Sequence, residues 1–151
     1  WIRRRISEMT EITKRAVIRV QDVMFRRFEI IDGFSTVADA IQRMRDTRSK
    51  ALFVARRDPD DEWGILLLSD IAKKVLAKDR SPERVNVYEI MKKPLLGVDP
   101  AMDIRYCARL FERHRLNRAA VIDNREVIGI VSYADIVIKG MKKLLDEAAA
   151  D

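Results

Sequence analysis

The chain has 151 residues, 48% of them hydrophobic, which is enough for a buried core in one compact domain or two small ones. Its 30 basic and 24 acidic residues give a net charge of +6, which suits anionic partners, although the two signs are interleaved as on an ordinary solvated surface. No apolar run reaches the roughly 20 residues of a membrane span, no signal peptide is visible, and one cysteine excludes an internal disulfide, so we expect a cytoplasmic protein that does not use a membrane.

The first predicted element is an amphipathic helix over residues 1–16. Apolar residues recur there at helical spacing: Ile2, Ile6, Met9 and Ile12. We expect this helix to pack on the rest of the chain or on a second copy of it. Attachment to a membrane surface through the arginines at 3–5 is the alternative.

Two series of elements follow, over residues 17–80 and 81–144, and in each we predict strand, helix, strand, strand, helix. Short apolar runs mark the strands, namely FEII, ALFVA and GILLL, then LLGV, AAVI and VIGIVS. The helix after each first strand has one apolar face: Val37, Ala40, Ile41 and Met44, then Ile104, Cys107, Ala108 and Phe111. Candidate helix starts are Ser35 and either Asp99 or Asp103.

A long helix is predicted at the end of the chain, over Ile136–Ala149. Its segment MKKLLDEAAA consists mostly of strong helix formers. Residues 145–151 would then form a helical tail beyond the second series.

The two series are an internal repeat. An offset of 67 residues carries VQDVM (20–24) onto VYEIM (87–91), and IIDGFSTV (30–37) onto GVDPAMDI (97–104). With one inserted residue, SKALFV (49–54) falls on NRAAVI (117–122). The phrase GILLLSD (64–70) then meets GIVSYAD (129–135), after an exposed hairpin loop, DPDDEW, that is about three residues longer in the first copy. One small sheet with two helices leaves an apolar face open, so we expect the copies to pack together by a pseudo-twofold.

This repeated set resembles a pair of CBS domains, also called a Bateman module. The resemblance rests on the DVM and EIM openings, the strands ALFV and AAVI, and the two Gly-to-Asp phrases, and it covers residues 17–144. It implies an α/β (α+β) fold of two βαββα repeats with flanking helices. It also implies a non-catalytic regulatory module that binds adenosine-containing ligands such as AMP, ATP, NAD or S-adenosylmethionine in clefts between the repeats and pairs as a homodimer.

The two Gly-to-Asp phrases predict unequal half-sites. An aspartate at a helix start just past a strand is fixed well enough to accept hydrogen bonds from ribose hydroxyls, and Asp135 and Asp70 both have this place, although each could serve only as an N-cap. Ser132 matches the family's Ser/Thr position and can donate to phosphate, whereas Leu67 cannot. We therefore expect the Ser132 cleft to bind phosphate better, and the Leu67 cleft to bind a bare nucleoside, another ligand or nothing.

The resemblance implies further ligand-binding residues. Family members direct residues just before the middle strand at the phosphates, which here are Asn117, Arg118, Ser49 and Lys50, with solvated surface charge as the alternative for the two cations. Residues matching the base-lining positions are Met24, Glu29 and Ile130 for the Ser132 cleft, and Met91, Leu96 and Ile65 for the other. Core packing is the alternative for the apolar ones.

The leading functional hypothesis is a nucleotide sensor that signals to a partner protein or to a domain outside this sequence. The alternatives are a ligand-free homodimerisation scaffold and a nucleic-acid-binding module, which Arg105, Arg109 and Arg113 suggest but the few exposed aromatics disfavour. An enzyme is the least expected class, because no nucleophile stands with a base, and we expect no required cofactor. His114 is the single histidine, which disfavours a metal site, and Cys107 is expected in the core.

Overall fold

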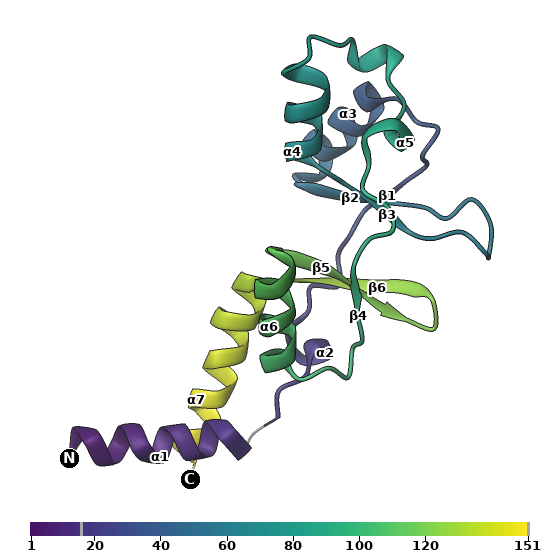
Figure 1. Cartoon of the computed structure of the whole chain (residues 1–151). Helices are drawn as coiled ribbons and strands as arrows, with labels where there is room; N and C mark the ends of the chain where they lie inside the picture. Colours follow the sequence, from purple (N-terminus) through teal and green to yellow (C-terminus); the bar gives the residue numbers. More distant parts are fainter. Residues whose placement is uncertain (16, 151) are drawn as a thin grey trace. The chain divides into compact units, whose positions relative to one another are not determined.

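A computed structural model describes the backbone of residues 1–15 and 17–150 and the side chains of residues 1–8 and 17–150. The chain divides into two compact units. One, the mid-chain unit, is Phe28–Leu95; the other, the terminal unit, combines Trp1–Arg27 with Leu96–Asp151. Each unit has its own three-stranded sheet and its own buried core (Figure 1).

The mid-chain unit is built on strands β1 (Ile30–Ile31), β2 (Ala51–Val54) and β3 (Gly64–Leu67), in that order. Strand β2 pairs parallel with β1 and antiparallel with β3. Its helical segments are α3 (Val37–Thr47), α4 (Leu68–Ile71), the π-helix η1 (Ala72–Leu76), the 3₁₀ turn η2 (Pro82–Arg84) and α5 (Val87–Ile90). The predicted order strand, helix, strand, strand, helix is confirmed, with a first strand shorter than FEII.

The terminal unit repeats this arrangement with β4 (Gly97–Val98), β5 (Arg118–Asp123) and β6 (Glu126–Ser132). Its helical segments are α1 (Ile2–Arg15), α2 (Val20–Val23), α6 (Ile104–His114), the π-helix η3 (Asp135–Gly140) and α7 (Met141–Ala150). Helix α1 packs against α7, so the two ends of the chain meet within one unit (Figure 1). The helix predicted over Ile136–Ala149 is present, and its first part, η3, is wound as a π-helix.

Each repeat begins with a short opening segment, 20–25 in the first and 87–92 in the second. Each opening segment belongs to the unit that contains the sheet of the other repeat. Phe25, two residues after α2, exchanges backbone hydrogen bonds with Ile130 of β6, at 2.8 and 2.9 Å. In the same way Lys92, after α5, exchanges two bonds of 2.9 Å with Ile65 of β3. The segment that begins the first repeat therefore extends the sheet of the second repeat, and the reverse.

The helix starts follow local capping. Helix α6 starts at Asp103, whose carboxylate accepts the backbone N–H of Arg105, as one of the two predicted starts. For α3 the expected start, Ser35, is wrong by one residue: Thr36 caps the helix by accepting the N–H of Asp39, in a reciprocal capping box. Thr36 wins because only its hydroxyl has an acidic residue three positions on.

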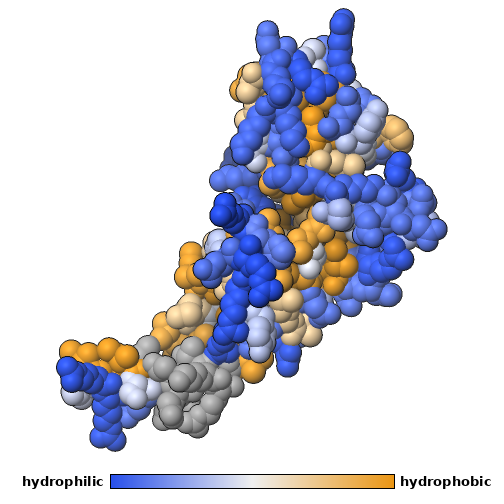
Figure 2. Space-filling view, viewed as in Figure 1, coloured by the Kyte–Doolittle hydropathy of each residue, from blue (hydrophilic) through white to orange (hydrophobic). Residues whose placement is uncertain are grey.

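The predicted helix faces supply both cores. Val37, Ala40 and Met44 of α3 are buried, as are Ile104, Cys107 and Phe111 of α6. Ile41 is the exception, because it is 40% exposed. Helix α1 shows an uncovered apolar side at its N-terminal end (Figure 2), where Trp1, Ile2 and Ile6 are 87%, 65% and 57% exposed. Met9 and Ile12, also predicted on that side, lie outside the described side chains.

The long β2–β3 connection of the mid-chain unit is held by a three-residue clamp. Asp61 accepts hydrogen bonds from the backbone and the Nε of Arg57, at 3.0 and 3.1 Å, and its other oxygen lies 2.6 Å from Lys93 Nζ. Lys93 and Arg57 thereby lower the pKa of the Asp61 carboxyl far below its usual range. The corresponding β5–β6 hairpin is short and turns through Asn124 and Arg125, whose φ angles are 49° and 67°.

We predict that the Gly-to-Asp phrases must begin with glycine, because the opening segments pack closely against that position. A Cβ on Gly129 would lie 3.0 Å from the carbonyl oxygen of Phe25 and 3.0 Å from Met24 Sδ. Gly129→Ala should therefore lower the free energy of unfolding by about 1–3 kcal/mol, measured by urea denaturation. Gly33→Ala is the matched control, because its Cβ would meet nothing closer than 3.4 Å. Equal losses in both variants would contradict the close-approach explanation.

We also predict that the clamp depends on Lys93. The carboxyl-carbon NMR signal of Asp61 should titrate well below an ordinary aspartate, and Lys93→Met should move its midpoint upward. The folded pKa is depressed, so the clamp's stabilisation is complete above the unfolded pKa of about 3.9 and is lost as the pH falls through the folded pKa. Lys92→Met is the control, because Lys92 faces Asp70 and should leave Asp61 unchanged.

Candidate functional site

The Ser132–Asp135 half-site lies in the terminal unit, where β6 passes into the following helix. The backbone N–H of Ser132 donates to Asp135 Oδ2 at 2.9 Å, and the Ser132 hydroxyl lies 3.1 Å from the same oxygen. The N–H of Asp135 donates back to the Ser132 hydroxyl at 3.3 Å. Asp135 is buried, with 8% of its surface exposed. Ser132 is therefore the N-cap and Asp135 the third residue of the helix, in a reciprocal capping box that holds the carboxylate against the end of the strand.

A lysine one helical turn on completes this half-site. Lys139 Nζ lies 2.8 Å from Asp135 Oδ1 and 3.3 Å from the carbonyl oxygen of Val23, at the end of α2. It also lies 5.5 Å from the centre of the Phe25 ring, as in a cation–π contact. Lys139 therefore joins the capping aspartate to the opening segment. Sequence analysis missed this residue, although its spacing of four from Asp135 was a usable signal.

The Leu67–Asp70 half-site of the mid-chain unit has the same framework. The N–H of Leu67 donates to Asp70 Oδ2 at 2.9 Å, and Asp70 is buried. Two lysines face Asp70 Oδ1, Lys74 at 3.8 Å and Lys92 at 3.5 Å. Lys74 also donates to the carbonyl oxygen of Ile90 at 2.9 Å, as Lys139 does to Val23. The two half-sites thus share the cap and the lysine and differ in the hydroxyl.

Strand register sharpens the difference between the half-sites. Arg118 stands directly opposite Ser132 in the β5–β6 pair, whereas Ala51 stands opposite Leu67 in the β2–β3 pair. The backbone contacts after the strands agree, because Lys50 O accepts from Leu68 N where Asn117 O accepts from Tyr133 N. The inserted residue in the sequence alignment was therefore wrong: Lys50 corresponds to Asn117, and the mid-chain unit has alanine where the terminal unit has Arg118.

The remaining predicted ligand residues are divided between the units. The terminal unit contains Asn117, Met24, Ile130 and Leu96, and the mid-chain unit contains Ser49, Glu29, Ile65 and Met91. Glu29 pairs with Arg43 at 3.3 Å, and Ser49 accepts the hydroxyl hydrogen of Thr47 at 3.0 Å. Met24 and Met91 each approach the glycine of a Gly-to-Asp phrase, Gly129 and Gly64. Their contacts with those glycines support the core-packing alternative for both methionines.

The other candidate chemistries find little support among the described residues. In that part of the chain no three His, Cys, Asp or Glu side chains gather as metal ligands, and no helix is long and apolar enough to cross a membrane. Cys107 is buried in the core of the terminal unit, and burial raises its pKa to about 11. The thiol is therefore protonated at neutral pH, as expected of a core residue. His114 is the last residue of α6.

The family model for the CBS domain matches the chain twice, at residues 20–77 and 87–141. The chain belongs to the CBS-domain family. It is a tandem CBS protein, and each match includes one opening segment, one sheet and one of the half-sites described above. The family consists of regulatory modules, and the α+β fold expected from the resemblance is confirmed.

A solved structure and two protein relatives are similar to this chain. A hexameric CBS-CP12 protein from bloom-forming cyanobacteria is 38% identical, with a TM-score of 0.78 over 83% of this chain and 73% of that one. Hypoxic response protein 1 of Mycobacterium tuberculosis is 29% identical over 116 residues, 77% of this chain and 80% of that protein. An uncharacterised Methanopyrus kandleri protein is 25% identical over 114 residues, 74% of this chain but 58% of its own length.

We predict that Asp135 is needed for stability as well as for any ligand. Asp135→Ala removes the cap of the Ser132 N–H and the partner of Lys139, and should cost about 1–3 kcal/mol of unfolding free energy in urea. Asp146→Ala, at an exposed position of α7, is the control and should change stability by less than about 0.5 kcal/mol. A loss no larger than that of the control would show that the cap is dispensable.

Proposed function

We propose that this protein is a regulatory module that binds an adenosine-containing ligand of the AMP, ATP or NAD type at the Ser132–Asp135 half-site. The observation that carries the proposal is the cross-strand pair of Arg118 and Ser132, three residues before the buried carboxylate of Asp135. A guanidinium and a hydroxyl on neighbouring strands are suited to a phosphate, because both donate hydrogen bonds and one is charged. A carboxylate beside them is suited to ribose hydroxyls.

The internal bonds of the half-site leave room for a ligand. Asp135 accepts two hydrogen bonds on Oδ2 and one ion pair on Oδ1, and each carboxylate oxygen has two lone pairs. The Ser132 hydroxyl can rotate from Asp135 to a phosphate oxygen, while the backbone N–H of Ser132 maintains the cap. Lys139, which is about half exposed, adds a second positive charge beside Asp135. Together these groups favour a ligand with both an anion and hydroxyls.

We propose that the Leu67–Asp70 half-site does not bind phosphate in this way. Ala51 and Leu67 replace the two donors, and Asp70 already faces two lysines. A nucleoside without phosphate, or no ligand, suits this half-site better. The protein would then have one phosphate-selective site rather than two equal ones. Regulation requires that the ligand bind one conformation more tightly than another, since a ligand shifts an equilibrium only by that difference.

Self-association without a ligand is the second candidate function. Large apolar side chains on η3 and α7 are uncovered in the single chain: Val137, Ile138, Met141 and Leu145 are 54%, 68%, 47% and 45% exposed. A contiguous apolar surface of this kind is typical of a protein interface. The cyanobacterial relative is hexameric, which supports a homo-oligomer here as well.

We predict a ligand-dependent stabilisation that distinguishes the roles of Ser132 and Asp135. A ligand at about 100 times its dissociation constant should stabilise the fold by roughly 2.7 kcal/mol, or about 5–10 °C in Tm. AMP, ATP, NAD and S-adenosylmethionine are compared by thermal unfolding, and the best ligand is then compared with adenosine by calorimetry. Ser132→Ala should weaken the phosphorylated ligand by roughly tenfold and adenosine much less, because the lost hydroxyl is the proposed phosphate donor and only one of the contacts that hold Asp135.

Leu67→Ala is the matched control, since it changes the same position of the other phrase and should leave this affinity unchanged. Ser132→Ala is preferred to Asp135→Ala because it keeps the buried carboxylate and its bond to the Ser132 N–H, and removes only the hydroxyl that accepts the Asp135 N–H. If sedimentation shows a folded oligomer and none of these ligands shifts its Tm, the sensor hypothesis is rejected in favour of the scaffold. Equal losses for AMP and adenosine in Ser132→Ala would refute the phosphate role.

A further inference from the structure

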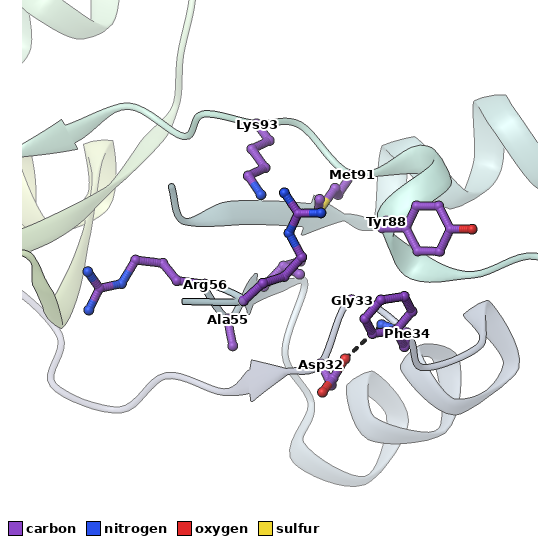
Figure 3. Close-up of a pocket in the computed structure, with 10 residues that line it drawn as sticks. Asp32, Gly33, Phe34, Ala55, Arg56, Tyr88, Met91 and Lys93 are labelled. Carbon is purple, nitrogen blue, oxygen red and sulfur yellow. Dashed lines mark hydrogen bonds between the residues drawn. The ribbon is translucent and has the colours of Figure 1, made fainter. Parts of the chain in front are cut away.

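The mid-chain unit contains a pocket outside the Gly-to-Asp phrase. Its volume is about 390 Å³, within the range of small-molecule sites. It is lined by the β1–α3 turn, the end of β2 and the α5 segment (Figure 3): Asp32, Gly33, Phe34, Val54, Ala55, Arg56, Arg57, Tyr88, Met91 and Lys93. Of the residues predicted for the Leu67 half-site, only Met91 is among them. The pocket is therefore a separate feature from the proposed nucleotide site.

Two exposed aromatic rings form one side of the pocket. Phe34 and Tyr88 are 68% and 50% exposed, and their rings meet edge to face with centroids 5.7 Å apart. Backbone bonds hold both residues: Phe34 N donates to Asp32 Oδ1 at 2.8 Å, and Tyr88 N donates to Gly33 O at 2.9 Å. The backbone at both positions is therefore held, and the two rings leave apolar surface uncovered for a flat ligand.

Two cations of the pocket lining, Arg57 and Lys93, are held by the Asp61 clamp. Asp61 engages Arg57 through its Nε and holds Lys93 through the other oxygen. In the part of the chain that the structure describes, the two terminal amino groups of Arg57 remain as donors, in a planar fork that suits phosphate or carboxylate. Arg56 also lines the pocket, but its head group points away from the aromatic pair and lies over Trp63 (Figure 3).

The second repeat supplies an internal comparison. The offset of 67 residues places Ala101 at the position of Phe34 and Gln21 at the position of Tyr88. The Asx turn itself is present in both units, because Ala101 N donates to Asp99 Oδ1 as Phe34 N does to Asp32. The loop that provides Asp61 is absent from the short β5–β6 hairpin. The CBS framework therefore does not require the aromatic pair or the clamp.

We propose that this pocket binds a small aromatic anion, a flat ring carrying a phosphate or carboxylate group. The ring would lie against Phe34 and Tyr88, and the anionic group would face Arg57 and Lys93. Asp32 is the one acidic residue of the lining, against three cations, Arg56, Arg57 and Lys93, so the charge stays positive even when the clamp carboxylate of Asp61 is counted. The protein would thus respond to a second ligand through the mid-chain unit alone.

The test uses phenyl phosphate as the probe, with inorganic phosphate and phenol as its two halves. Assigned amide NMR spectra of the whole chain are recorded during each titration. Phenyl phosphate should shift the amides of residues 32–34, 54–57 and 88–93 with a dissociation constant in the millimolar range or below, about −4 kcal/mol or better. Each half alone should bind at least about fivefold more weakly, because ring and anion contribute separately.

Two variants keep the result specific. Phe34→Ala with Tyr88→Gln installs the residues of the other repeat and should weaken phenyl phosphate by about five- to tenfold, with amide dispersion as the check on folding. Arg57→Lys should weaken it several-fold, because it retains the charge and loses the fork. Gln21→Ala, at the counterpart of Tyr88, is the control and should have no effect.

Three outcomes would overturn the proposal. One is no saturable shift with phenyl phosphate. Another is that inorganic phosphate binds as tightly as phenyl phosphate. The aromatic ring would then contribute nothing, and the pocket would be only a positively charged surface. The third is a response confined to Asn117, Arg118, Ser132 and Asp135, which would assign the probe to the proposed nucleotide half-site. Because the adenosine ligands are measured through Ser132→Ala, failure of either proposal leaves the other testable.

Discussion

A buried aspartate holds each unit together through three elements at once. Asp135 and Asp70 accept the backbone N–H at the end of a strand, lie in the first turn of the next helix, and pair with a lysine four residues on. That lysine also reaches a carbonyl oxygen of the opening segment, Val23 in one unit and Ile90 in the other. A carboxylate buried without these partners would be costly, so the strand, the helix and the opening segment are fixed by the same group.

The same constraint leaves other positions free to differ. Once the cap and the lysine hold the backbone, the residue at the strand end can be Ser132 or Leu67 with the same N–H bonded to the aspartate. The residue opposite it can be Arg118 or Ala51. At the other end of the sheet, Phe34 and Ala101 likewise follow the same Asx turn. A repeated fold can thus carry different side chains around a shared backbone framework without a change of architecture.

Much of the fold was predictable from the sequence, because apolar periodicity and the repeat identify the strands, the helix faces and the family. The wrong predictions concern strand register and helix capping, which depend on backbone hydrogen bonds that the sequence does not show directly. The similar composition of SKALFV and NRAAVI favoured an inserted residue, and only the hydrogen-bond register showed that none exists. The start of α3 was misplaced because two hydroxyl residues are adjacent and the choice rests on Asp39. The lysine pairs and the aromatic pocket were missed because they join residues distant in sequence or absent from one repeat.

The exchange of opening segments determines whether the chain can be divided into separate repeats. Neither repeat is self-sufficient, because the sheet of each is extended by residues that the other repeat encodes. A chain cut within residues 79–86, between the two repeats, would give two fragments. Each fragment would have a strand edge that its own residues do not cover. Such halves would be expected to assemble only when produced together. The two repeats therefore need each other to complete their sheets.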